Sequence, residues 1–142
     1  MSKSYKFIDH TADIAAEISG SSLEELFAAG AEALLHSSVD EIQFEDDDIL
    51  EFDLSASSKE ELLITFLNEI NYLLITKKWL YSSIQSIKIF NGTDGYELSI
   101  ELNGTELKKD IKLRQEIKSV TYHQVEIVEA EGHYSTLVVF DI

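Results

Sequence analysis

The sequence predicts an α+β fold in which a largely antiparallel or mixed β-sheet is packed by two principal α-helices. Two segments carry apolar residues at helical spacing, and most of the remaining chain alternates between apolar and polar residues as half-buried strands do. No proline and no Gly/Ser-rich linker interrupts the 142 residues. We therefore expect residues 1–142 to form a single domain.

The two predicted helices follow serine caps. Ser22 and Ser58 are each followed three residues later by a glutamate, which is the pattern of a capping box. The apolar stripe of the first helix comprises Leu23, Leu26, Phe27, Ala31, Leu34 and Leu35, and that of the second comprises Leu62, Leu63, Phe66, Leu67, Ile70, Leu73 and Leu74. We expect Lys77 and Lys78 to complement the negative end of the second helix dipole.

Strands are predicted where apolar residues recur with period two. These segments are 14–18, 49–54, a hairpin joining 84–89 to 96–102 through a turn at 91–95, and a last hairpin joining 120–129 to 134–140 around Glu131 and Gly132. Residues 137–140 are apolar on both faces. This predicts that the last strand is central in the sheet and covered by a helix.

The chain is strongly acidic, with a formal net charge of −16. Such a surface repels phosphate backbones, so we expect no extensive direct nucleic-acid binding, and basic proteins and divalent cations are the natural ligands. The alternative to a role in ligand binding is that the acidity mainly keeps the protein soluble. There are no cysteines, which excludes disulfides, zinc–thiolate sites and thiol nucleophiles. The N-terminus lacks the apolar run of a signal peptide and no stretch approaches a membrane span, so we expect a cytoplasmic protein without a membrane partner.

Basic residues are concentrated in one segment, 108–118. It contains five of the eleven basic residues, Lys108, Lys109, Lys112, Arg114 and Lys118. This segment has two interpretations: it pairs with an acidic patch of a partner or a nucleotide phosphate, or it is a solvated loop that balances neighbouring carboxylates.

Candidate ligands for a cation lie near both ends of the chain. Asp13 belongs to a polar turn that also contains His10, and Asp141 follows an apolar strand, one residue before the α-carboxylate of Ile142. If Asp13 lies beside that end, three carboxylates converge, and Ca²⁺, Mg²⁺ or Mn²⁺ would relieve their repulsion because these ions prefer oxygen ligands. The alternatives are Asx and ST turns around Asp13 and a solvated terminal residue at Asp141.

The other histidines carry less information. His123 lies in an alternating strand, where a hydrogen-bonded, partly buried histidine is the alternative to a functional one. His36 and His133 carry no functional signal.

Four blocks of the sequence, in order, resemble the archease family. They are His10-Thr11-Ala12-Asp13-Ile14, the capped helix start at 22–29, the segment Lys118-Ser119-Val120-Thr121-Tyr122-His123, and the final Asp141-Ile142. The resemblance implies that Asp13, Asp141 and the α-carboxylate of Ile142 bind a divalent metal ion. It also implies a non-catalytic protein that activates the GTP- and Mn²⁺-dependent RtcB-type RNA ligase of tRNA splicing or RNA repair, promoting guanylylation of the ligase and multiple turnover.

The sequence departs from the family pattern at several positions. Ala15 and Ala16 stand where many relatives have glycine followed by an aliphatic residue, and Ser119 replaces an alanine. The basic segment lacks the histidine often found in relatives, and Asp110 stands near that place. Asp40, after the first helix, is interpreted as a helix-terminal residue.

Two other classes of function are open. One is a metal-dependent enzyme acting on phosphoesters, with His10 or His123 as general base and Asp13 and Asp141 holding the ion. Against it, the sequence contains no activated nucleophile and no phosphate-cradling glycine loop. The other is a general acidic chaperone or scaffold. It predicts protection of unrelated clients and indifference to loss of Asp13.

Overall fold

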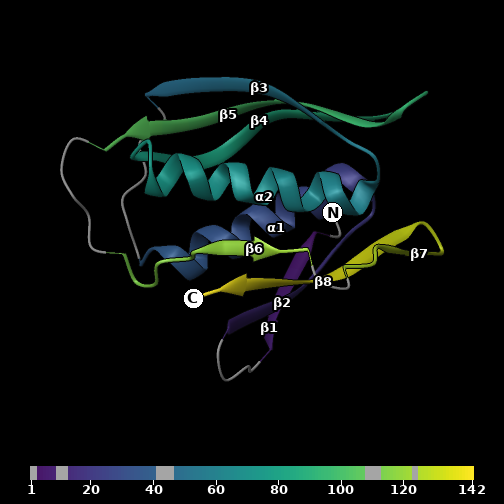
Figure 1. Ribbon diagram of the computed structural model, residues 1–142, viewed down its shortest axis with the longest axis horizontal. Helices are drawn as coiled ribbons and strands as arrows, with labels where there is room; N and C mark the ends of the chain where they lie inside the picture. The colour runs from purple at the N-terminus through teal and green to yellow at the C-terminus, as the bar shows by residue number, and fades with distance from the viewer. Residues whose placement is uncertain (1–2, 9–12, 41–46, 108–112, 123–124) are drawn as a thin grey trace.

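The chain folds into three layers, in which two helices lie between two antiparallel β-sheets (Figure 1). The computed structural model describes residues 3–8, 13–40, 47–107, 113–122 and 125–142. The first sheet contains, in spatial order, β1 (Ser4–Ile8), β2 (Asp13–Gly20), β8 (His133–Asp141) and β6 (Ser119–Thr121), and β7 (Val128–Ala130) also pairs with β8. The second contains β3 (Asp48–Ala56), β5 (Gly95–Glu106) and β4 (Trp79–Gly92). The predicted α+β class is confirmed, with the strands divided between two sheets.

The helices begin at the predicted caps. In α1 (Leu23–Ser38) the Ser22 hydroxyl oxygen accepts a hydrogen bond from the backbone N–H of Glu25, and in α2 (Lys59–Ile75) Ser58 does the same for Glu61, each at 3.1 Å. These bonds satisfy N–H groups that have no partner within the helix. Neither described helix combines the length and the apolar character that a membrane crossing requires.

Lys77 and Lys78 lie at the far end of α2, directly after the helix and not within its last turn. The C-cap of α2 is Thr76, so both lysines follow the helix, and its last turn contains no basic residue. Lys78 has a positive φ of 55°, and its carbonyl accepts a hydrogen bond from the N–H of Leu107 at 2.7 Å. The chain therefore turns from α2 toward β4 at these two lysines.

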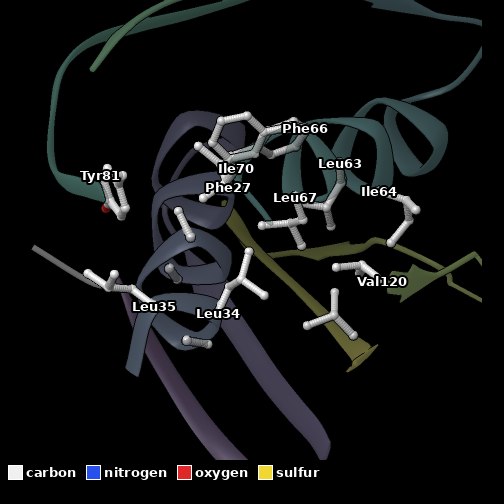
Figure 2. Close-up of a cluster of buried hydrophobic side chains, with 14 of the residues drawn as sticks. Phe27, Leu34, Leu35, Leu63, Ile64, Phe66, Leu67, Ile70, Tyr81 and Val120 are labelled. Atoms are coloured by element: carbon white, nitrogen blue, oxygen red, sulfur yellow. The ribbon is translucent and has the colours of Figure 1, made fainter. Parts of the chain in front are cut away.

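The core lies between the two sheets and is centred on a pair of aromatic rings. Phe27 of α1 and Phe66 of α2 are both fully buried and stack with their ring centroids 5.6 Å apart. Figure 2 shows them among the apolar side chains that the helical spacing predicts. Both sheets contribute to the same cluster, including Ile18, Leu98 and Phe140.

The hairpin of β4 and β5 is confirmed, but β4 is irregular. Ile84 and Ile87 are three positions apart, so an unbroken strand would point their side chains to opposite faces. Both pack against the core, opposite Leu102 and Ile100, because the register of β4 shifts between Ile84 and Ser86.

The strand predicted over 120–129 is not continuous. It is replaced by β6 and β7, which pair with opposite ends of one edge of β8, and residues 122 and 125–127 lie outside strands. More residues separate Thr121 from Val128 than separate their partners Val139 and Ser135 on β8. The excess residues cannot join the ladder, so the strand is interrupted.

The last strand is central, as predicted, but the helices cover one of its faces only. Val138 and Phe140 are fully buried under the helices, whereas Leu137 on the opposite face is 40% exposed and Val139 is half-buried. The outer face of the first sheet is thus partly apolar. This face also carries the candidate site.

Phe66→Ala should lower the free energy of unfolding by about 3–5 kcal/mol, because it removes a fully buried ring from a closely packed cluster. Tyr72→Ala on the same helix is the matched control, since Tyr72 is 42% exposed and its loss should cost less than about 1 kcal/mol. Urea denaturation followed by circular dichroism measures both. Equal losses would contradict a core centred on the aromatic pair.

Candidate functional site

Asp13 and Asp141 lie directly opposite each other. Asp13 is the first residue of β2, Asp141 is the last residue of β8, and the antiparallel register pairs the two. Residues paired in this way point to the same face, with Cβ atoms about 4.5–5.5 Å apart. The structure therefore brings together two acidic residues from opposite ends of the sequence, and Ile142 follows immediately.

Both carboxylates lie on the outer face of the first sheet. Their neighbours Ile14 and Phe140 also oppose each other and pack toward the helices, with Phe140 fully buried. Because side chains alternate along a strand, Asp13 and Asp141 point the other way. Both are half-buried, so they are open to a ligand without being fully hydrated.

A third strand holds Asp141 from its other side. Ser119, the first residue of β6, is paired with Asp141, and its hydroxyl donates a hydrogen bond to Asp141 Oδ2 at 3.0 Å. The backbone N–H of Lys118 donates to the carbonyl of Asp141 at 2.8 Å. Ser119 is the position at which the sequence departs from the alanine of the family segment. The departure therefore falls on a contact with the candidate site.

Two asparagines of α2 anchor the segment that carries Ser119. The side-chain amide of Asn68 bonds both backbone groups of Val120: Nδ2 donates to the carbonyl at 3.0 Å, and Oδ1 accepts from the N–H at 2.8 Å. Asn71 Nδ2 donates to the carbonyl of Ile117 at 2.7 Å. The sequence analysis missed both residues. Their spacing of three, which places two amides on one side of an amphipathic helix, was the available signal.

Like charges directly opposite each other in a sheet are unfavourable, so this site has an electrostatic cost. Within the described ranges, no group of three or more His, Cys, Asp or Glu side chains gathers in a way that could hold a metal ion. Among the described residues, the side-chain atoms at this end of the sheet that could bind a cation include the oxygens of Asp13, Asp141 and Ser119. A set made only of oxygens suits hard cations such as Ca²⁺, Mg²⁺ or Mn²⁺.

A buried hydroxyl lies on the same outer face. Thr121 Oγ1 is buried and has no hydrogen-bond partner within the part of the chain that the structure describes. Thr121 pairs with Val139, one row away from Asp141. Buried polar atoms are rarely left unpaired, so this hydroxyl is suited to a polar group from a bound water, ion or partner.

The remaining sequence candidates lie elsewhere or outside the described residues. A pocket of about 360 Å³ beside Asp13 is lined in part by Arg114 and His36. Arg114 Nε lies 3.9 Å from Asp40 Oδ1, and both side chains are largely exposed. This exposed pair agrees with a helix-terminal role for Asp40 and shows Arg114 largely solvated beside a carboxylate. Residues 9–12, 108–112 and 123–124 lie outside the described ranges, and with them His10 and His123.

His36 has a structural contact. Its Nδ1 lies 2.5 Å from the hydroxyl of Tyr5, which joins the end of α1 to β1. Partial burial, followed by the negative charge of Glu32, raises the pKa of Tyr5. Both effects favour the protonated form of the hydroxyl.

Two helices between antiparallel sheets, an acidic composition and facing carboxylates at one sheet end define a small acidic α+β protein whose candidate site offers oxygen ligands. Residues 5–142 match the model of the archease protein family (MTH1598/TM1083), and the chain belongs to this family. The resemblance found in the sequence is confirmed.

Curated relatives and solved structures agree with this membership. The archease of Archaeoglobus fulgidus is 32% identical over 138 residues, covering 97% of this chain and 98% of that protein. The archease of Methanosarcina barkeri is 30% identical over 141 residues, covering 99% and 97%. Protein 1598 of Methanobacterium thermoautotrophicum has a TM-score of 0.83 at 29% identity, covering 97% and 98%. A Thermotoga maritima archease, described as a possible chaperone, has a TM-score of 0.61 at 29% identity, covering 96% of each chain.

Asp141→Asn should raise the free energy of unfolding by roughly 0.2–1 kcal/mol in low-salt buffer with EDTA, because it removes a like charge opposite Asp13. Added salt should shrink the gain by screening the repulsion. Asp53→Asn, on the exposed face of the second sheet, is the control. Thermal and urea unfolding give the values. A loss of stability on Asp141→Asn would show that repulsion between these carboxylates is not the dominant effect.

Proposed function

We propose that this archease binds a divalent metal ion through Asp13, Asp141 and the α-carboxylate of Ile142, and activates an RtcB-type RNA ligase in the cytoplasm. The ligase performs the RNA chemistry of tRNA splicing or RNA repair, and this chain is a non-catalytic partner. The observation that carries the proposal is the opposed register of Asp13 and Asp141 at the end of the first sheet.

The proposed ion is Ca²⁺, Mg²⁺ or Mn²⁺. When bound, it supplies positive charge between carboxylates that otherwise repel each other. The chain's own contribution is to hold two acidic side chains on one face and to keep that face half-exposed. A partner can then reach the ion from the open side.

Action through a protein partner is supported by charge. A protein of net charge −16 is attracted to a basic surface, and such complementarity raises the rate of encounter more than the final affinity. The ligase cleft is expected to be basic and metal-dependent because it binds RNA and GTP. In the proposed mechanism the acidic end of the first sheet enters this cleft and holds a conformation that is competent for guanylylation.

The contact surface is proposed to extend along the outer face of the first sheet. On β8, Val139 and Leu137 lead away from Asp141 on this face, and Val128 of β7 is 50% exposed beside them. Glu17, paired with Leu137, is exposed and adds a negative charge beside these apolar side chains. The matching ligase surface would be apolar at its centre and basic at its edge.

Asp13→Asn and Asp141→Asn should each reduce the stimulation of ligase guanylylation by at least about tenfold, the factor that 1.4 kcal/mol of lost interaction produces. The measurement follows covalent labelling of the cognate ligase by labelled GTP, with and without the archease. Asp53→Asn is again the control, because it removes an equal charge from the second sheet.

Each competing function predicts a different outcome. Full stimulation by both variants would defeat the proposal. Turnover of a nucleotide or phosphoester by the purified archease alone would favour the enzyme, and protection of unrelated clients by the Asp13→Asn variant would favour the general chaperone.

Leu137→Ser should weaken binding of the ligase about fivefold, since about 1 kcal/mol of apolar contact is lost. Ile49→Ser is the matched control, because Ile49 is 57% exposed on the outer face of the second sheet. Calorimetric titration of the ligase with each variant measures the affinity. If Ile49→Ser weakened binding and Leu137→Ser did not, the contact surface would lie on the second sheet.

A further inference from the structure

Ser119 donates a side-chain hydrogen bond to Asp141, and the direction from which this bond reaches the carboxylate is informative. Asp141 lies between two neighbours in the sheet, with Asp13 on β2 on one side and Ser119 on β6 on the other. The Ser119 hydroxyl donates to Oδ2 at 3.0 Å. The bond therefore reaches Asp141 from the side opposite Asp13 and engages Oδ2. The other carboxylate oxygen, Oδ1, is not the one bound by Ser119.

The donor is held in place by the body of the protein. β6 is only three residues long, and its middle residue, Val120, is bonded through both backbone groups to Asn68 of α2. Val120 is itself 3% exposed, and its side chain lies in the cluster of Figure 2. Ser119 is therefore fixed relative to the core on one side and to β8 on the other.

We propose that Ser119 is a positioning residue for Asp141 in the metal site. By holding Oδ2, it restricts rotation of the carboxylate and presents Oδ1 to a cation shared with Asp13. Hydrogen bonds from such outer partners orient ligating carboxylates, and their removal typically lowers metal affinity. The bond also offsets part of the negative charge that Asp141 places opposite Asp13. This inference rests on the metal site of the proposed function.

The test compares pairs of variants that differ by one hydroxyl. Ser119→Thr keeps the hydroxyl and Ser119→Val, nearly the same shape, removes it; both residues are favoured in strands. Ser119→Ala removes the hydroxyl without adding bulk. Ser86→Ala is the matched control, because Ser86 is paired with Glu101 on the second sheet and its hydroxyl donates to that carboxylate at 3.4 Å.

Isothermal titration with MnCl₂ and with CaCl₂ measures the affinity of each protein. Ser119→Ala and Ser119→Val should raise the Kd about tenfold, whereas Ser119→Thr should stay within about twofold of the wild type. Ser86→Ala should leave the Kd unchanged. In EDTA, the urea midpoints of the variants should stay close to that of the wild type, because at most one hydrogen bond is lost, so the loss of affinity is not a loss of fold.

The two proposals fail in different ways. If the wild type binds a metal and the Ala and Val variants bind it equally well, Ser119 has no positioning role while the metal site stands. If the wild type takes up neither metal, the metal site and the role of Ser119 fall together. Equal weakening by Thr and Val would also overturn the inference, since the hydroxyl would then make no difference.

Discussion

The antiparallel pairing of β2 with β8 is the interaction on which the candidate site depends. It joins residues near the two ends of the chain, so its formation carries a substantial loop-closure cost. Burial on the inner face offsets that cost, because Ile14 opposes Phe140 and Ala16 opposes Val138 in the core. A slip of one residue would move this apolar set to the outer face. The packing of the core thus sets the register that places Asp13 opposite Asp141.

The same pairing places the unfavourable charges where they cost least. At the end of the sheet, on the face away from the helices, Asp13 and Asp141 keep partial contact with solvent. In the interior such a pair would face a much larger desolvation penalty. Asp141 is further stabilised by Ser119, which is held through Val120 by Asn68 of α2. The site is therefore supported by a helix on the opposite side of the sheet.

Local patterns predicted the elements better than their arrangement. The caps at Ser22 and Ser58 locate both helices because capping is chemistry within one turn, and alternation locates most strands. The division into two sheets, the bulge beside Ile84 and the interruption between β6 and β7 depend on pairing between distant segments, which periodicity does not report. For the same reason the residues alone left open whether Asp13 and Asp141 meet, and only the register answers it.

Under the proposed function, the pair of acidic side chains at the sheet end leaves part of the ion's coordination to other groups. Within the described residues the sheet end brings together Asp13 and Asp141, whereas Ca²⁺ takes six to eight oxygen ligands and Mg²⁺ six. Under the proposed function, the ion would keep positions for water or for groups of the ligase. A rigid sheet end with few ligands can then share an ion across an interface, which a complete protein cage would prevent. The half-exposed outer face, with Leu137 beside the carboxylates, meets both requirements of such sharing: access to the ion and an apolar surface on which the partner can rest.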